Sequence, residues 1–202
     1  MVGCLFSLKM IEYKTQVNRK DVNLMAIDWL ILDKIQQIFG SGFCDWFMPK
    51  ITVLGNAGIV WIIIGVAMLI SKKYRKYGFL VLIGLLIGLI VGNGIVKNVV
   101  QRERPCWIDN DFKMLIAIPK DYSFPSGHTQ ASCIAATIIT LTNKKFGWVV
   151  IPFAVLIAFS RMYLYVHFPT DIIGGAVLGI TIGALTYVYG TKILKINKER
   201  TI

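Results

Sequence analysis

The chain has 202 residues, of which 55% are hydrophobic, and its mean hydropathy is +0.63. This composition is too apolar for an ordinary soluble domain, so we predict an integral membrane protein. The formal net charge is +11. We do not expect a nucleic-acid partner, because the cations fall in short loops and in three motifs, without a basic stripe that interleaves with aromatic residues.

The first fifty residues differ from the rest of the chain. Residues 1–24 are mixed and charged, whereas residues 26–39 place apolar side chains at a helical period among polar ones. This pattern predicts an amphipathic helix that ends at Gly40. The helix could lie in the outer membrane interface, or it could cover the helix bundle as a lid.

We expect no cleavable signal peptide, because residues 1–10 lack a basic start, an adequate apolar run and a cleavage site. Met25 is a candidate native start, since the basic residues before it fit poorly on the outer face. We divide the chain into an N-terminal segment (residues 1–50), a membrane-embedded domain (51–190) and a basic cytoplasmic tail (191–202).

Five further stretches approach the roughly 20 apolar residues that a helix needs to cross a bilayer. The third is less apolar, but its small alanines permit close helix contact, so we expect a central helix that is mostly shielded from lipid. The sequence therefore predicts an all-α, polytopic membrane helix bundle with about five transmembrane helices, or six as the alternative. The five stretches are residues 53–71, 79–96, 127–141, 147–162 and 172–190.

The loops give the expected orientation of these helices. Residues 72–76 and 143–145 and the C-terminal tail are basic and fall on one side of the membrane. By the positive-inside rule this side is cytoplasmic. Helix parity then brings three motifs together at the extracytoplasmic end.

The first motif combines Lys97, near the end of the second stretch, with Arg104 and Pro105 in the following loop. An arginine fork can hold two phosphate oxygens, a lysine adds a mobile charge, and a proline stiffens the loop. Alone, these cations could simply reach the lipid head groups.

The second motif is Pro125, Ser126, Gly127 and His128, where the third stretch begins. Ser126 suits a helix N-cap, and Gly127 lets the backbone approach a ligand closely. Backbone N–H groups at a helix start bind phosphate, and His128 could carry a proton at the rim. Alternatively, this motif is a simple helix cap that binds no ligand.

The third motif places Arg161 and His167 before Asp171, where Pro169 separates two helices. Asp171 in a first helical turn is favoured as an anion. It could accept a hydrogen bond from one nitrogen of His167 and leave the other nitrogen unprotonated and nucleophilic. Alternatively, Asp171 only caps a helix and His167 lies in the head-group layer.

The three motifs together resemble those of the type 2 phosphatidic acid phosphatase family, which also includes glucose-6-phosphatase and vanadium haloperoxidases. Every motif position is matched. The resemblance implies that His167 attacks phosphorus to form a phosphohistidine, that Asp171 orients His167, and that His128 protonates the leaving oxygen. It also implies that no metal or other cofactor is needed, which suits a chain with two histidines and four cysteines without metal-type spacing. The phosphoryl oxygens would be held by Lys97, Arg104, Ser126, Gly127 and Arg161.

Many bacterial members have six membrane helices, so the N-terminal topology is where this chain departs from the family. A site at the outer end of a bundle suggests a lipid phosphate as substrate. We favour undecaprenyl diphosphate over phosphatidylglycerophosphate or phosphatidic acid. Two other classes are a non-catalytic lipid-phosphate binding or transport protein, and a haloperoxidase-like vanadate site, against which the membrane bundle argues. A disulfide between Cys44 and Cys106 is conceivable, but no pattern indicates it.

Overall fold

The structure is a computed structural model that describes residues 19–196. Within this range the chain forms helices and no strand, as the predicted all-α class requires. Residues 1–18, which the signal-peptide and Met25 hypotheses concern, and residues 197–202 of the basic tail lie outside the described residues. The elements are α2 (Arg19–Phe39), α3 (Gly42–Gly55), η1 (Asn56–Gly58), α4 (Ile59–Ile70), α5 (Arg75–Gly88), η2 (Leu89–Val96), α6 (Lys97–Val100), α7 (Pro105–Ile108), α8 (Gly127–Thr142), α9 (Lys144–Tyr163) and α10 (Pro169–Ile193).

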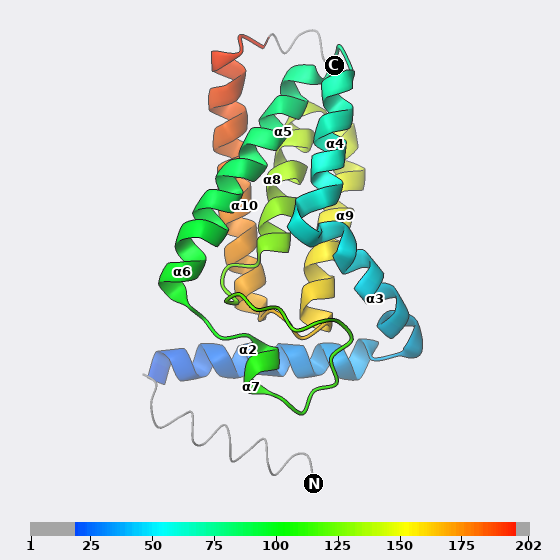
Figure 1. Cartoon of the computed structure of the whole chain (residues 1–202), viewed down its shortest axis with the longest axis vertical. Coiled ribbons are helices and arrows are strands. Elements are labelled where there is room, and N and C mark those ends of the chain that lie inside the picture. The colour runs from blue at the N-terminus through cyan, green and yellow to red at the C-terminus, as the bar shows by residue number, and fades with distance from the viewer. Residues whose placement is uncertain (1–18, 197–202) are drawn as a thin grey trace.

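The upright helices α4, α5, α8, α9 and α10 form a bundle, and α2 lies across one end of it (Figure 1). Four helical segments are long and apolar enough to cross a membrane. The remaining predicted helix, over residues 127–141, corresponds to α8, which has 16 residues and is shorter than each of the four segments. The four segments are Gly42–Ile70, Arg75–Ile108, Lys144–Tyr163 and Pro169–Ile193.

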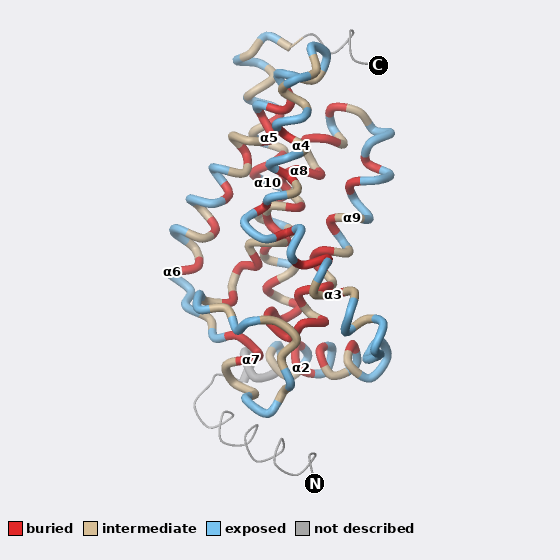
Figure 2. Tube along the Cα trace, turned by 45° about the vertical axis from the view of Figure 1, so that its right-hand side comes forward, coloured by how far each residue is buried: buried red, intermediate tan, exposed pale blue. Residues whose placement is uncertain are grey.

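Helix α8 is central, because it packs against α5, α9 and α10. Buried residues gather where these helices meet, whereas exposed residues lie on the outer side of α9 (Figure 2). The approach of α10 is close: a Cβ at Gly175 would lie 2.7 Å from the backbone oxygen of Ser126, and one at Gly183 would lie 2.9 Å from that of Ile134. Small residues on α10 thus let the backbones of the two helices meet, as in other membrane bundles.

The first membrane segment is broken where we expected one helix over residues 53–71. Helix α3 ends at Gly55, and α4 begins at Ile59 after the short element η1. Ala57 and Gly58 have φ angles of 50° and 69°, in the left-handed region that interrupts a right-handed helix. The break brings Asn56 to the wall of the cavity described below.

The basic loops share the end of the bundle opposite α2 (Figure 1). Lys76 Nζ donates a hydrogen bond to the carbonyl oxygen of Leu194 at 2.7 Å. The rings of Tyr74 and Phe146 lie 5.6 Å apart. The predicted clustering of the basic loops is therefore present, while α2, α7 and the loop between α7 and α8 occupy the other end.

Helix α2 presents an unexpected face to the protein. Trp29 and Leu32 are buried against the bundle, and so is Asp28, which is only 1% exposed. The side chains that we took as the apolar face are mostly exposed, including Ile27 and Leu30. Helix α2 thus covers the end of the bundle and leaves apolar side chains exposed on its outer side. Its place at the outer membrane interface stays a prediction.

Candidate active site

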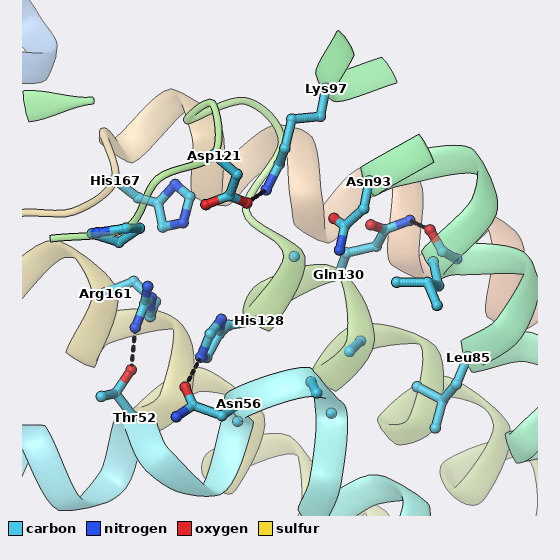
Figure 3. Close-up of a pocket in the computed structure, with 18 of the residues that line it drawn as sticks. Thr52, Asn56, Leu85, Asn93, Lys97, Asp121, His128, Gln130, Arg161 and His167 are labelled. Atoms are coloured by element: carbon cyan, nitrogen blue, oxygen red, sulfur yellow. Dashed lines mark hydrogen bonds and ion pairs between the residues drawn. The ribbon is translucent and has the colours of Figure 1, made fainter. Parts of the chain in front are cut away.

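A cavity of about 710 Å³ lies between the end of the bundle near α2 and the side of α5 (Figure 3). Six of the eight predicted site residues line it. The other two, Ser126 and Asp171, are fully buried behind its wall. The six are Lys97, Arg104, Gly127, His128, Arg161 and His167.

Lys97 and Arg104 meet on one carboxylate, that of Asp121. Lys97 Nζ lies 2.5 Å from Asp121 Oδ2, and Arg104 Nη2 lies 2.8 Å from Asp121 Oδ1. Both cations are buried, whereas the side chain of Asp121 is 56% exposed. The two carboxylate oxygens are held as two oxygens of a phosphate would be held by the same cations.

The pKa of Asp121 reflects these contacts. Burial alone would raise it, but the hydrogen bond from Lys97 and the charge of Arg104 outweigh burial and lower the pKa to about 2. Asp121 is therefore ionised throughout the physiological pH range and competes for both cations.

Arg104 is fixed by further contacts that leave it little freedom. Its Nε donates to the backbone oxygen of Asp121 at 2.7 Å, and its Nη1 donates to that of Val166 at 2.6 Å. Its Nη1 also lies 3.1 Å from His167 Nε2. Since a guanidinium can only donate, Nε2 accepts, and the ring proton of neutral His167 is on Nδ1.

His167 lies in the short link between α9 and α10 and is 1% exposed. Burial, together with the charges of Arg104 and Arg161, holds its pKa well below the ordinary value of 6.5. The imidazole is therefore neutral at pH 7, and its Nε2 lone pair faces the cation cluster. A neutral ring whose Nε2 carries a lone pair is what a histidine nucleophile requires, and this lone pair becomes available when Arg104 Nη1 releases it.

Asp171 supports the other side of this ring, but less directly than we expected. His167 Nδ1 and Asp171 Oδ2 are 3.6 Å apart, which is longer than a hydrogen bond. The hydroxyl of Ser123 connects them: it lies 3.4 Å from Nδ1 and donates to Asp171 Oδ2 at 2.5 Å. The Oδ2 atom also accepts from Phe168 N at 2.8 Å, so Asp171 caps the start of α10.

The second motif forms the start of α8. Ser126 is the N-cap, and its hydroxyl accepts hydrogen bonds from the backbone N–H and the hydroxyl of Thr129. At the next position the fit is tight, because a Cβ at Gly127 would lie 3.0 Å from Asn93 Oδ1. Ser126 therefore acts as a cap in this structure, and Gly127 reaches the cavity wall.

The segment of α3 and η1 holds the remaining two site residues (Figure 3). Arg161 Nη1 donates to Thr52 Oγ1 at 2.5 Å, while Arg161 Nε is buried without a hydrogen-bond partner. His128 Nε2 lies 2.9 Å from Asn56 Oδ1. Because an amide oxygen accepts, this contact places a proton on Nε2 of His128.

Sequence reasoning missed five polar residues that hold the site together. Three of them adjoin the recognised motifs in the sequence: Arg102 precedes Arg104, and Asp121 and Ser123 precede Pro125. These three residues could have been found in the sequence as polar residues that lie close to a motif. Thr52 and Asn56 carry no such signal, because their part in the site depends on how the first membrane segment packs.

The cysteines and the acidic residues complete the description of the site. Cys44 and Cys106 are both free, so the disulfide considered from the sequence is not formed. Within residues 19–196, histidine, cysteine, aspartate and glutamate side chains form no group of three or more that could hold a metal ion.

The chain is similar to known proteins in sequence and fold. Undecaprenyl-diphosphatase of Sulfolobus acidocaldarius is 38% identical over 128 residues, which are 63% of this chain and 62% of that protein. Phosphatidylglycerophosphatase B of Bacillus subtilis is 32% identical over 171 residues, covering 75% of this chain and 78% of that protein. The crystal structure of a transmembrane PAP2-type phosphatidylglycerolphosphate phosphatase from Bacillus subtilis matches with a TM-score of 0.70 and 26% identity, covering 96% and 98% of the two chains.

The family model of the PAP2 superfamily matches residues 73–195, which include all three motifs. With its apolar helices and membrane relatives, the chain is a multi-pass membrane protein. The chain therefore belongs to the PAP2 superfamily, that of the type 2 phosphatidic acid phosphatases, and it is similar to relatives named undecaprenyl-diphosphatase.

Proposed function

We propose that this protein is a lipid phosphatase that removes the terminal phosphate of undecaprenyl diphosphate through a phosphohistidine on His167. The observation that carries the proposal is the two-sided lining of the cavity. One side holds Lys97, Arg104 and His167, and the other is apolar. The apolar side consists of Ile62, Leu82, Leu85, Leu86 and Leu89.

The apolar side of the cavity reaches the outer surface of the bundle. Leu86 and Leu89 line the cavity and are also 52% and 57% exposed. In a membrane, these side chains would contact lipid. A substrate with a phosphate at one end and a hydrocarbon tail at the other suits such a cavity, with the tail along α5 and the phosphate on the cations.

The proposed reaction begins when the terminal phosphate replaces the carboxylate of Asp121 on Lys97 and Arg104. Nε2 of His167 then forms a bond to phosphorus while the bond from phosphorus to the bridging oxygen breaks. His128, protonated once the anionic phosphate is bound, gives this proton to the departing lipid phosphate and becomes neutral. Arg104 lies beside Nε2, so it can stabilise the charge that develops on the phosphoryl oxygens.

In the second half of the reaction, water attacks the phosphorus of the phosphohistidine. His128 takes a proton from this water, the bond between nitrogen and phosphorus breaks, and inorganic phosphate leaves. Ser123 and Asp171 keep the proton of His167 on Nδ1 in both steps, so that Nε2 remains the reactive nitrogen.

The relatives support this substrate class without deciding the lipid. Two of them are named undecaprenyl-diphosphatase and one phosphatidylglycerophosphatase. We favour undecaprenyl diphosphate, and phosphatidylglycerophosphate and phosphatidic acid are the alternatives. The clustered cations suit a ligand with high negative charge, which a diphosphate carries.

The experiment is phosphate release by the purified protein from each of the three lipids, with His167→Ala as the control. Undecaprenyl diphosphate labelled in its terminal phosphate should also leave an acid-labile label on the protein but not on His167→Ala. Phosphate release that persists in His167→Ala would refute the assignment of His167 as the nucleophile. Binding of the lipids without any release would instead favour a lipid-phosphate binding or transport protein.

We also propose that the site faces the extracytoplasmic side and that the C-terminus is cytoplasmic, because the basic loops lie at the opposite end of the bundle. The test uses single cysteines in a variant whose native cysteines are replaced. A membrane-impermeant thiol reagent should label Asn110→Cys in intact cells and should not label Lys73→Cys. The reverse pattern would overturn the orientation.

A further inference from the structure

Asp28 is a buried carboxylate on a helix outside the bundle. It is 1% exposed, although its neighbours Ile27 and Leu30 are exposed. Burying a carboxylate is costly unless charges and hydrogen bonds compensate it. Asp28 has both: Oδ1 accepts from Thr170 N at 3.0 Å, and Oδ2 lies 2.6 Å from Arg102 Nη2 and accepts from Thr170 Oγ1 at 2.5 Å.

Arg102 extends this contact to the active site. Its Nη2 pairs with Asp28, while its Nη1 lies 2.7 Å from Asp171 Oδ1. The guanidinium also lies over the ring of Phe168, 4.2 Å from the centroid. The planar fork of one arginine thus joins two buried carboxylates, one on α2 and one at the start of α10.

The contacts of Asp171 explain why this link matters. Its Oδ2 atom accepts hydrogen bonds from the Ser123 hydroxyl and from Phe168 N, and the Ser123 hydroxyl also contacts Nδ1 of His167. Its Oδ1 atom pairs with Arg102. Since Asp171 is fully buried, it depends on the arginine for charge compensation, and its orientation depends on where that arginine is held.

Arg102 needs a second anchor to hold one position. Its side chain is 20% exposed. Its Nη1 contacts Asp171 and donates to Thr170 Oγ1 at 2.6 Å, whereas the partner of its Nη2 is Asp28. Without that partner the long side chain would keep more rotational freedom. Asp28 supplies the second anchor. Helix α2 is itself placed by Trp29, whose ring packs edge-on against Phe168 at 5.1 Å between centroids.

We propose that α2 is part of the catalytic machinery, with Asp28 acting through Arg102 to hold Asp171, and through it His167, in the reactive orientation. Asp28 and Arg102 are positioning residues, because neither lies on the cavity wall where the phosphate would bind. The inference rests on the proposed function, since it concerns the rate of that reaction.

Asp28→Asn separates this role from simple packing of α2. The amide oxygen can still accept from Thr170 N, but the amide nitrogen cannot accept from Arg102. We expect kcat to fall about 10- to 100-fold, the range for loss of a partner that supports a reactive group. KM should stay within about twofold, because the phosphate-binding cations are untouched. The matched control is Asp33→Asn, which makes the same charge change on the same helix away from Arg102.

A double-mutant cycle tests the route of the effect. If Asp28 acts through Arg102, Asp28→Asn should have little further effect on kcat in an Arg102→Gln background. Arg102→Lys should retain more kcat than Arg102→Gln, because it keeps the charge without the fork. Thermal unfolding and size-exclusion profiles of each variant report whether the protein is folded.

The outcomes distinguish the inference from the proposed function. A folded Asp28→Asn protein with wild-type kcat, or independent effects in the cycle, would overturn the inference and leave the phosphatase assignment intact. If Asp28→Asn does not fold, equal kcat values for Arg102→Lys and Arg102→Gln would overturn it. A wild-type protein that releases phosphate from none of the lipids would refute the proposed function and the inference with it.

Discussion

Asp121→Asn should make the protein bind inorganic phosphate more tightly. In the structure the carboxylate of Asp121 occupies both Lys97 and Arg104, at 2.5 and 2.8 Å, so a phosphate must displace it. The asparagine has a similar shape but no charge, and it competes less well for the two cations. The substitution therefore removes a competitor that the protein itself supplies.

The size of the effect follows from the exposure of the carboxylate. Because the side chain is 56% exposed, each ion pair falls at the weak end of the scale, at about 1 kcal/mol. Two such pairs give about 2 kcal/mol, which corresponds to about 30-fold in affinity. Mild acidification cannot imitate the substitution, since the pKa of Asp121 is about 2. The stabilisation from these pairs is present above about pH 4 and is lost as the pH falls toward the folded pKa.

The assay is inhibition of turnover by inorganic phosphate, the expected product, at constant ionic strength. The inhibition constant of Asp121→Asn should fall by about tenfold to thirtyfold. Asp111→Asn, an exposed position in the same loop, controls for the general change in charge. An inhibition constant that is unchanged or higher in Asp121→Asn would refute the reasoning, and would show that Asp121 holds the cations in place for the phosphate instead of competing with it.

The remaining predictions concern the histidines and the cations. With ¹⁵N-labelled histidine, NMR should show His167 neutral at pH 7, protonated on Nδ1, and titrating well below pH 6.5, since burial and Arg104 lower its pKa; a midpoint at or above 6.5 contradicts this. The stability linked to its neutral ring should be complete above about pH 6.5 and decline at lower pH. A chelator should leave kcat unchanged, because cationic side chains bind the phosphate; loss of activity that a divalent ion restores would disprove this. Gly55→Ala should lower kcat by on the order of tenfold to a hundredfold, because its Cβ would lie 2.7 Å from the ring of His128; wild-type kcat would show that the ring position is not critical.

Much of the site was predictable because phosphate chemistry leaves a local signature. Arg104 before Pro105, His167 two residues before Pro169 and Ser126 before Gly127 each lie where a helix starts or ends, so spacing and capping rules place them. Hydropathy then gave the helices and brought the motifs to one end of the bundle. These predictions needed only short stretches of sequence.

The rest depended on contacts between distant segments. Asp28 looked like part of a solvated polar face, because periodicity alone cannot tell which side of a helix a neighbour will cover. Ser123 was not foreseen between His167 and Asp171, since the distance that separates their side chains is set by tertiary packing. The helix break at Ala57 was missed although Gly55, Asn56 and Gly58 surround it, because the apolar residues on both sides suggested one membrane helix.

That break has a consequence for the timing of catalysis. Thr52 and Asn56 are four residues apart, and they hold Arg161 and His128 respectively. Thr52 lies in the last turn of α3, and Asn56 is the C-cap of the same helix. A shift of this segment would therefore displace both contacts at once, so the group that binds the phosphate and the group that supplies the proton would change position together.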